Sequence, residues 1–452
     1  MKYILKNKDI DVLEFEIDKN VKAFKGQEIV EQDIMNISIL NIDLLPINLP
    51  NKLDNEILKK WVRNRKIPAH RKYARKILDS IGIDDADLIG YLNVSLGLSL
   101  NDSFWIVPAD KDYKWKDFNL YGNEFSEALK LAAFGITSKK LNEISTSPEL
   151  TTSGMLPKCW HRENGQIYLY KGSSKMNNGA DEPCIEFYMA QIADVMGFEY
   201  VPYDLKEFHG QIVSSCPIFT NENEGYAPMY LCLGENERKY VGVELANAVY
   251  KIYDNDKFDD LMVFDALVCN TDRHLGNFGM IIDNNTNKLL RPAPIFDNGL
   301  SIMAHIGLDE LTQIQEESSK MTGYFNFKFD EQLRLFVQPR HIPNLQKLTE
   351  FEFIKHSEFN LGDEWLEPIQ AYLQDRAKFA LQIAYEKQDK EEQSKKDFAG
   401  FEFSNTSGMD KIRDEVLVKE QSSINTQKPT KNDGDKPDTD KDKPSGPSGP
   451  RM

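Results

Sequence analysis

The sequence predicts an α+β fold, and three observations favour this class. An Asn-Gly pair at 164–165 lies between two apolar runs, which is typical of a β-hairpin. Apolar side chains at 185–196, 258–268 and 365–383 favour helices. Beyond residue 388 the chain is rich in Lys, Asp, Glu, Ser and Pro, so we expect residues 388–452 to form a disordered tail.

The composition indicates a folded chain of two or three domains. The 452 residues are 40% hydrophobic and 11% aromatic, which is enough for a sizeable core. The formal net charge of −17 argues against a general nucleic-acid-binding protein, whose surface is usually basic. The five cysteines show neither metal-ligand spacing nor a disulfide framework, which fits a reducing compartment. With no signal-type segment and no bilayer-length apolar run, we expect a cytoplasmic protein without a membrane partner.

Residues 1–125 form the first part of the chain, called the N-terminal region below, and their sequence predicts no chemistry. Alternating residues at 12–17 favour strands, and a helix is predicted over 70–81 because its apolar residues share one face. The opposite face and the residues before it form a basic segment at 63–76. Its basic members are Arg63, Arg65, Lys66, Arg71, Lys72, Arg75 and Lys76. Two interpretations stay open: a solvated amphipathic face, or a docking surface for an acidic partner or nucleic acid.

A candidate phosphate loop at 145–158 and a strand come next. The polar residues 145–153 are expected to be flexible, and they lead into Gly154 and Lys158. Backbone N–H groups of such a loop can cradle phosphates, and a lysine adds positive charge. The following strand places Lys171 in line with apolar side chains, where a lysine needs a partner or a ligand. A strand-end lysine that reaches solvent is the alternative.

A helix with an acidic residue at its border follows the strand. Pro183 suits the first turn, and Gly197 ends the apolar stripe. Glu186 borders this stripe, so it either points inward to pair with Lys171 or lies in water. Beyond it, a strand is predicted over 212–219, and the polar residues 221–240 are expected to form a loop.

The most informative stretch of the sequence runs from residue 264 to residue 299. A buried helix precedes Asp272, a strand follows Asn277, and a second strand is expected to end at Asp297, in an Asp-x-Gly sequence. Phosphoryl transfer needs one carboxylate near a hydroxyl nucleophile and two oxygen ligands for Mg²⁺. Asp272 can supply the first, and Asn277 and Asp297 the other two. Each piece alone is also typical of a turn, but together and in this order they favour a phosphoryl-transfer site.

This stretch resembles the HipA-type serine/threonine kinases, including the CtkA-like group. Ordinary protein kinases also place an Asp five residues before an Asn and use an Asp-x-Gly metal loop. Here the order is Asp272-Arg273-His274, an inversion that resembles the HipA-type family. The resemblance covers roughly residues 153–383 and implies a bilobal protein-kinase-like fold. The expected parts are an extra N-terminal α/β subdomain at 1–125, a β-rich N-lobe at 126–220, a helical C-lobe at 221–387 and the disordered tail at 388–452.

The resemblance also implies a role for each site residue. Asp272 would orient the substrate hydroxyl or accept its proton, and Lys171, held by Glu186, would bind phosphate. Asn277 and Asp297 would bind Mg²⁺. The expected ATP-binding residues are Ser153, Gly154, Met155, Leu156, Pro157, Lys158, Lys171, Pro217, Ile218, Phe219, His274, Asn277, Phe296 and Asp297. The strand-end residues at 217–219 would form the hinge that holds adenine.

The candidate phosphate loop both matches and departs from the family pattern. Gly154 to Lys158 resembles the family's Gly-x-x-x-Lys loop, but Met-Leu-Pro stands where Ala-Gln-x is more usual. HipA-type kinases phosphorylate a serine in this loop to silence themselves. By analogy, the site of autophosphorylation would be Thr151, Thr152 or Ser153.

The function that the resemblance implies is an ATP- and Mg²⁺-dependent serine/threonine protein kinase with an unidentified protein substrate. A toxin of a toxin–antitoxin pair or a phage-defence effector is a compatible biological role, and a cognate antitoxin or regulator would then be a partner. Contact with nucleic acid would be only indirect, through such a partner or through the basic segment. Two other classes stay open: a pseudokinase or scaffold that binds without turnover, and a lipid kinase, which shares the Asp-Arg-His-x-x-Asn pattern.

Overall fold

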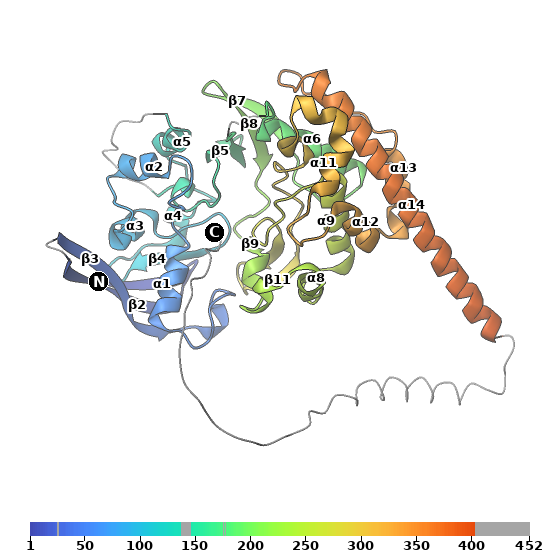
Figure 1. The fold of residues 1–452 in the computed structure, drawn as a ribbon. Helices are drawn as coiled ribbons and strands as arrows, with labels where there is room; N and C mark the ends of the chain where they lie inside the picture. Colours follow the sequence, from blue (N-terminus) through green and yellow to red (C-terminus); the bar gives the residue numbers. More distant parts are fainter. Residues whose placement is uncertain (25–26, 137–145, 175, 177, 403–452) are drawn as a thin grey trace, which may run out of the picture. The chain divides into compact units, whose positions relative to one another are not determined.

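The computed structural model describes residues 1–24, 27–136, 146–174, 176 and 178–402. Residues Met1–Gln388 form one compact unit. Within the described residues, the paired strands are antiparallel and make three sheets, with the orders β3-β2-β1-β4, β5-β6-β8-β7 and β11-β10-β9. The predicted combination of strands and helices is therefore confirmed, and the sheets are antiparallel (Figure 1).

The first sheet and its helices belong to the N-terminal region. The strands are β1 (Lys2–Asn7), β2 (Ile10–Phe24), β3 (Gln27–Ile39) and β4 (Phe104–Pro108). Buried residues alternate with partly exposed ones along β1 and at 13–17 in β2, as the sequence pattern predicts. The helices of this part are α1 (Asn55–Arg63), α2 (Ala74–Ile81), α3 (Leu88–Ser95), α4 (Trp115–Phe118) and α5 (Glu127–Ala133). Helix α2 begins later than predicted because Tyr73 has a left-handed φ of 65°.

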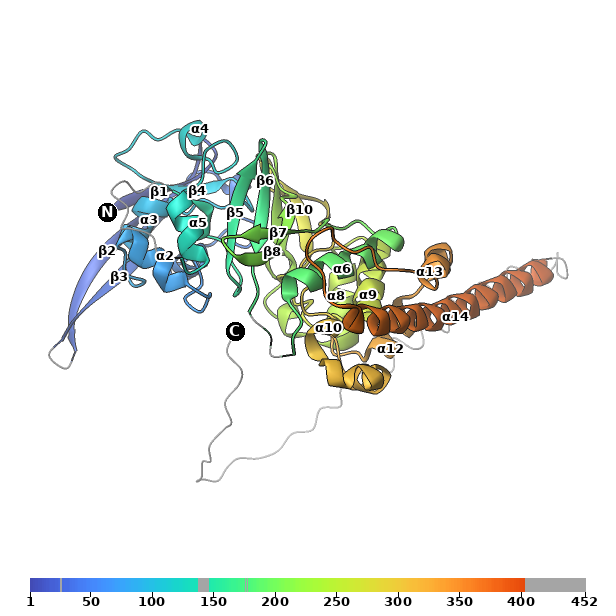
Figure 2. The same cartoon turned by 90° about the horizontal axis from the view of Figure 1, so that it is seen from above.

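The second sheet carries the predicted hairpin. Its strands are β5 (Lys158–Glu163), β6 (Gln166–Lys171), β7 (Asp204–Phe208) and β8 (Gln211–Pro217). Asn164 and Gly165 have φ values of 51° and 81°, the conformation that a tight hairpin turn requires, so the hairpin prediction is confirmed. Helix α5 packs against β5, and α6 (Glu182–Val195) packs against β8, so this sheet lies between the two helices (Figure 2).

The third sheet corrects one prediction. The polar residues 221–240, expected to be a loop, contain β9 (Glu224–Pro228), which pairs with β10 (Gly279–Asp283). The outer strand of this sheet is β11 (Lys288–Pro292). Tyr226 in β9 is buried against Ile281 of β10, so packing against the neighbouring strand stabilises β9 although its own sequence alternates poorly.

The remaining helices form the largest apolar core, which surrounds α9. The helix predicted to be buried at 258–268 is confirmed as α9 (Asn255–Val268), in which every residue from Phe258 onward is buried. The other α-helices of this part are α7 (Met229–Cys232), α8 (Gly242–Tyr250), α10 (Ile302–His305), α11 (Ile314–Lys320), α12 (Phe329–Phe336), α13 (Ile342–Leu348) and α14 (Asp363–Glu402). Short 3-10 helices are η1 (Ile42–Leu44), η2 (Pro148–Leu150), η3 (Glu237–Lys239), η4 (Leu308–Gln313) and η5 (Pro339–His341).

Helix α14 continues beyond the point at which the tail was predicted to begin. Disorder was expected from residue 388, but the described helix extends to Glu402. The run of Lys, Glu, Gln and Asp at 386–396 explains this, because most of these residues have high helix propensity even without an apolar face. Residues 403–452 of the predicted tail lie outside the described part of the chain. Within that described part, no helix is both long and apolar enough to cross a bilayer.

The basic segment at 63–76 is only partly a surface. Arg65 pairs with Asp102 at 2.8 Å, and Lys66 pairs with Asp85 at 3.0 Å. Arg71 is 2% exposed, so the interpretation of a solvated face is wrong for this residue. The sequence pattern could not show this, because Arg71 precedes α2 and does not belong to its outer face. Exposed basic residues of the segment are Arg63, Arg75 and Lys76.

Candidate functional site

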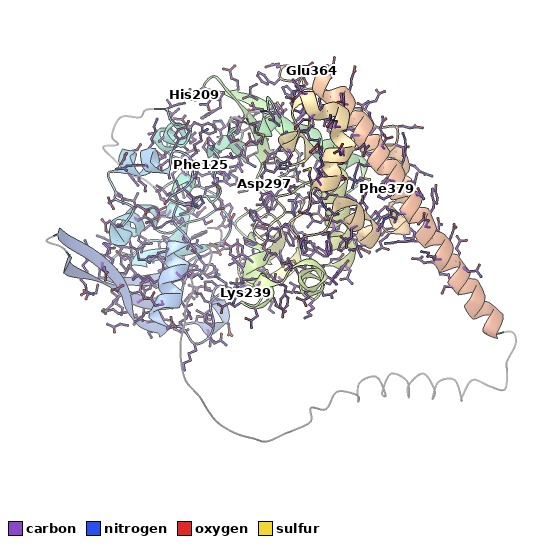
Figure 3. The ribbon with its side chains drawn as sticks, in the orientation of Figure 1. Phe125, His209, Lys239, Asp297, Glu364 and Phe379 are labelled. Atoms are coloured by element: carbon purple, nitrogen blue, oxygen red, sulfur yellow. The ribbon has the colours of Figure 1, made fainter. Side chains whose placement is uncertain are left out.

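Lys171 joins two acidic side chains that come from distant parts of the sequence. It is the last residue of β6, and its Nζ lies 2.6 Å from Oε1 of Glu186 and 2.5 Å from Oδ1 of Asp297. Glu186 is fully buried in α6, and Lys171 is 8% exposed. The lysine–glutamate pair inferred from the sequence is therefore present, and the alternative of a glutamate in water is wrong. Asp297 is labelled in Figure 3.

The second sheet and α6 together fix Glu186. Pro183 lies in the first turn of α6, and the stripe that begins at Ile185 is buried in the large core. From the opposite side, Ser214 Oγ of β8 donates a hydrogen bond to Oε2 of Glu186 at 2.5 Å. Ser214 lies opposite Lys171 in the β6–β8 pair. Both side chains that bond to Glu186 therefore come from neighbouring strands of the second sheet. Each carboxylate oxygen of Glu186 thus accepts a hydrogen bond, Oε1 from Lys171 and Oε2 from Ser214.

Asp297 has a backbone conformation that few non-glycine residues adopt. Its φ is 57°, and its N–H donates to the hydroxyl of Tyr203 at 3.0 Å. The sequence predicted a strand that ends at Asp297, but the observed strand, β11, ends at Pro292. Pro292 and Pro294 lack the N–H groups that a β-ladder needs, which explains the early end. The strained residue in an irregular segment is typical of a functional site.

Arg273 links the turn that carries Asn277 to the segment 296–298. Its Nη1 donates to the carbonyl of Asn277 at 2.9 Å and to the carbonyl of Phe296, and its Nη2 donates to Oδ1 of Asn298 at 2.8 Å. The carboxylate of Asp265, in α9, accepts from Nε and Nη2 at 2.9–3.1 Å. The guanidinium therefore fixes the spacing between the Asn277 turn and the Phe296 segment.

The turn after α9 brings Asp272 and Asn277 together. Nδ2 of Asn277 donates to the carbonyl of Asp272 at 2.9 Å and lies 3.4 Å from its Oδ2. The N–H of Asp272 donates to Oδ1 of Asn270 at 3.0 Å. His274 belongs to the same turn, where its Nδ1 accepts from the N–H of Gly276 at 3.0 Å. Nδ1 of the His274 imidazole thus stabilises the turn, and the predicted contact of His274 with ATP stays a prediction.

The candidate phosphate loop is tied down in its described part, residues 146–158. Oγ1 of Thr151 donates to the carbonyl of Leu98 at 2.5 Å, and Oγ1 of Thr152 donates to the carbonyl of Pro148 at 2.7 Å. Two hydroxyl groups of the stretch 146–153 thus bond to backbone carbonyls, and the expected flexibility of 145–153 stays a prediction. Residue 145 lies outside the described residues.

Gly154 and Lys158 lie close together at the end of this loop. Gly154 has a φ of 92°, and a Cβ atom at this position would collide with the amine of Lys158. The positive φ favours glycine here, whereas the Lys158 amine is the end of a flexible side chain that could move aside. Lys158 begins β5 and is the register partner of Lys171, so the two amines come from neighbouring strands. Of the other loop residues predicted to bind ATP, Ser153 and Met155 are exposed, Leu156 is half-buried and Pro157 is buried.

The charges of the site perturb each other strongly. Burial lowers the pKa of Lys158 to about 8, and the charge of Lys171 contributes in the same direction. Burial also acts to lower the pKa of Lys171, but Asp297 and Glu186 outweigh it, so the net shift is upward. For Asp297, burial is outweighed by the two lysines, which hold its pKa well below the ordinary value. The pKa of Asp272 is raised, chiefly by burial.

The predicted hinge differs from expectation in its backbone bonding. The N–H of Ile218 donates to the carbonyl of Ile167 at 2.9 Å, so this group already has a partner and is not available to an adenine ring. Order along the chain could not show this, because the bond depends on the register between β6 and β8. The ring centroid of Phe219 lies 5.3 Å from that of Phe296 and 5.5 Å from that of Tyr226. An apolar cluster thus connects the hinge to the Asp297 segment.

The side chains present fit a magnesium ion that would share its coordination with phosphate. Asn277 and Asp297 offer amide and carboxylate oxygens, the hard ligands that Mg²⁺ takes, and Mg²⁺ usually completes its shell with phosphate and water. No group of three or more His, Cys, Asp or Glu side chains that could hold a metal occurs in the described part of the chain. A cage built entirely from such side chains is therefore absent from these residues.

No protein-family model matches the sequence, and no curated protein matches it. Solved structures similar to the chain include a Helicobacter pylori kinase and a Shewanella oneidensis toxin–antitoxin protein. The Helicobacter pylori proinflammatory kinase CtkA is 20% identical with a TM-score of 0.41, and the match covers 52% of this chain and 93% of that one. HipA of Shewanella oneidensis MR-1, in a toxin–antitoxin complex with HipB and operator DNA, is 12% identical with a TM-score of 0.44, covering 83% and 96%. The likeness is coarse at these values, so the functional proposal depends on the site geometry.

Sequence reasoning missed the residues that hold the site in place. The residues in question are Arg71, Tyr203, Ser214, Asp265 and Asn298. One of them carried a usable signal: Asp265 lies in a helix that is otherwise apolar, and a buried carboxylate requires a partner. The others bond to groups that are distant in sequence, and no periodic pattern marks such a contact.

Proposed function

We propose that this chain is an ATP- and Mg²⁺-dependent serine/threonine protein kinase of HipA type. The observation that carries the proposal is the amine of Lys171, which bonds to Glu186 of α6 and to Asp297 of the motif at the same time. A kinase requires its strand lysine, its helix glutamate and its metal-binding aspartate to be in place together. This arrangement supports an assembled phosphoryl-transfer site.

In this proposal Asp272 orients the hydroxyl of the protein substrate and accepts its proton. Its carboxylate is partly buried, and the resulting upward shift of its pKa makes it a better proton acceptor than an exposed aspartate. Asn277 uses its Nδ2 to hold the backbone of Asp272, which leaves Oδ1 as the ligand atom. The proton acceptor and one metal ligand are thereby set by the same turn.

The positive groups of the site would bind the phosphates of ATP. Lys158 and Lys171 come from neighbouring strands, and Gly154 provides the close backbone approach that phosphate binding needs. Bound Mg²⁺ would neutralise charge on the β- and γ-phosphates. Arg273 keeps the two ligand-bearing segments at a fixed separation through the carbonyls of Asn277 and Phe296. Most of the rate enhancement then comes from positioning and charge stabilisation.

A transfer assay with [γ-³²P]ATP, Mg²⁺ and the purified chain tests the proposal. Wild type should transfer label to serine or threonine, and Asp272→Asn should reduce the rate by about 10²-fold or more while melting at the same temperature. Asp43→Asn, which changes an exposed aspartate of the N-terminal region, serves as the control and should retain full activity. Undiminished transfer in Asp272→Asn would show that Asp272 has no catalytic role.

The same assay separates the competing functions. Nucleotide binding without transfer would indicate a pseudokinase or scaffold, and label in added lipid rather than protein would indicate a lipid kinase. Comparing phosphoproteomes of cells that express wild type and Asp272→Asn would identify the protein substrate. Purification of the chain from its native cell under mild conditions would test for a cognate antitoxin or regulator.

A further inference from the structure

A single arginine of the N-terminal region holds the candidate phosphate loop on both flanks. Nη1 of Arg71 donates to the carbonyls of Thr152 at 3.1 Å and Glu149 at 3.4 Å, and Nη2 donates to the carbonyl of Lys158. Two of these carbonyls precede Gly154 and one follows it. The guanidinium therefore fixes the two flanks of the loop relative to each other.

Two further contacts bind the same loop to the N-terminal region. The N–H of Lys72 donates to the carbonyl of Met155 at 2.9 Å, next to Gly154. Oγ1 of Thr151 donates to the carbonyl of Leu98 at 2.5 Å. The loop backbone is thus bonded to this region at its middle as well as at its flanks.

The burial of Arg71 indicates that this position requires the hydrogen-bond donors of a guanidinium group. A buried charge is unfavourable unless hydrogen bonds compensate for its lost hydration, so an apolar residue would be cheaper in a purely structural position. Burial lowers the pKa of Arg71 to about 10, which leaves it charged at neutral pH, and the nearby Glu149 opposes the shift. The carboxylate of Glu149 accepts from Ser147 Oγ and from the N–H of Trp160, whereas Nη1 and Nη2 of Arg71 donate to loop carbonyls. Nε of Arg71 has no hydrogen-bond partner among the described residues.

We infer that Arg71 is a positioning residue for nucleotide binding, through which the N-terminal region sets the affinity of the site for ATP. It holds the chain so that the backbone at Gly154 and the amine of Lys158 face one phosphate group. This inference deepens the proposed kinase function and rests on it. A lysine could not replace the arginine, because one amine cannot reproduce the planar fork that reaches three carbonyls.

Two measurements on Arg71→Lys test the inference. Hydrogen–deuterium exchange of the nucleotide-free protein reports loop order in peptides that cover 146–160, and α9 peptides serve as an internal reference. Steady-state kinetics separates the KM for ATP from kcat. The matched control is Arg65→Lys, because Arg65 lies in the same region and bonds to Asp102 and to the carbonyls of Gly97 and Phe104, outside the loop.

Arg71→Lys should speed exchange at 146–160 and leave α9 unchanged. We expect the KM for ATP to rise about tenfold, as for the loss of one charge-assisted hydrogen bond. The value of kcat should stay within about twofold, because Arg71 does not touch the reacting groups. Thr151→Val, which removes the Leu98 bond without altering a buried charge, should change both quantities in the same direction by smaller factors, and it provides a second test if Arg71→Lys folds poorly.

Exchange and KM equal to wild type in both loop variants would overturn the inference. Equal effects from Arg65→Lys would also overturn it, since they would show a general loss of structure in the N-terminal region. If wild type transfers no phosphate at all, the proposed kinase function fails. The exchange experiment then still decides whether Arg71 fixes the loop, so the two failures are distinguishable.

Discussion

The carboxylate of Asp265 lies 2.9–3.1 Å from Nε and Nη2 of Arg273, and both side chains are at most 2% exposed. Arg273 also bonds to the carbonyl of Asn277, which is a proposed metal ligand. It bonds as well to the carbonyl of Phe296, the residue before Asp297, which is the second proposed metal ligand. An acid in the last turn of helix α9 therefore helps to fix the geometry of a site that it does not touch.

Asp265→Asn should impair both stability and activity. The substitution leaves the charge of Arg273 buried without a counter-ion, and breaking such a pair costs about 3–5 kcal/mol. Urea unfolding should show a loss of this order, and kcat should fall because the two ligand segments lose their fixed spacing. Asp259→Asn is the control: Asp259 is also a buried acid of α9, but it accepts from Tyr250 and Gln338. Full activity in Asp265→Asn would contradict the positioning role of this pair.

Lys171→Met should make stability strongly dependent on pH. Without the amine, the buried Glu186 keeps the like charge of the partly exposed Asp297 nearby and loses its counter-ion, so its folded-state pKa rises further above the unfolded one. Groups of this kind stabilise the fold at low pH and lose that contribution as pH rises through the raised pKa. The variant should therefore be closest to wild type at pH 5 and less stable by about 3 kcal/mol or more at pH 8, measured by urea unfolding. An equal difference at both pH values would contradict the assigned network.

Much of this site was predictable from local sequence. The hairpin before Lys171, the buried helix before Asp272 and the spacing to Asn277 each depend on residues close together in the chain, and their side-chain periods or turn residues are distinctive. The pairing of Lys171 with Glu186 could be inferred because β6 and α6 are consecutive.

The supporting contacts could not be predicted in this way. Arg71 reads as one member of a basic helix face, yet it bonds to loop carbonyls about 80 to 90 residues further along the chain. Likewise, residues 224–228 form strand β9 because they pair with β10. Thr151 holds the loop in place because its hydroxyl donates to the carbonyl of Leu98. Such contacts depend on tertiary placement, which overrides local propensity.

ATP binding should weaken as pH rises through the pKa of Lys158. Burial lowers this pKa to about 8 in the free protein, and a bound phosphate favours the charged amine, so it raises the pKa again. Binding at pH 8.5 should therefore take up protons, and calorimetry in two buffers with different ionisation enthalpies measures the number. Lys158→Met should abolish the uptake and the pH dependence together. Binding without proton uptake at this pH would show that the amine of Lys158 does not face phosphate.

Ser153 should be the residue of the loop that is autophosphorylated. Of the three candidates it alone is exposed, whereas the hydroxyls of Thr151 and Thr152 donate to backbone carbonyls and are half-buried. A phosphate at this position would place negative charge beside the ATP phosphates and should reduce activity. Peptide mass spectrometry after incubation with ATP checks the site, and Ser153→Ala should prevent the loss of activity. Phosphate on a threonine of the loop, or nowhere in it, would refute the assignment.

The central claim is that Asn277, Asp297 and Lys171 bind one Mg²⁺–nucleotide complex. A crystal structure of the chain with Mg²⁺ and a non-hydrolysable ATP analogue tests it directly. We expect Oδ1 of Asn277 and a carboxylate oxygen of Asp297 at about 2.0–2.1 Å from the metal, with Lys171 on a phosphate oxygen. A metal–nucleotide complex that lies away from these three side chains would contradict the account.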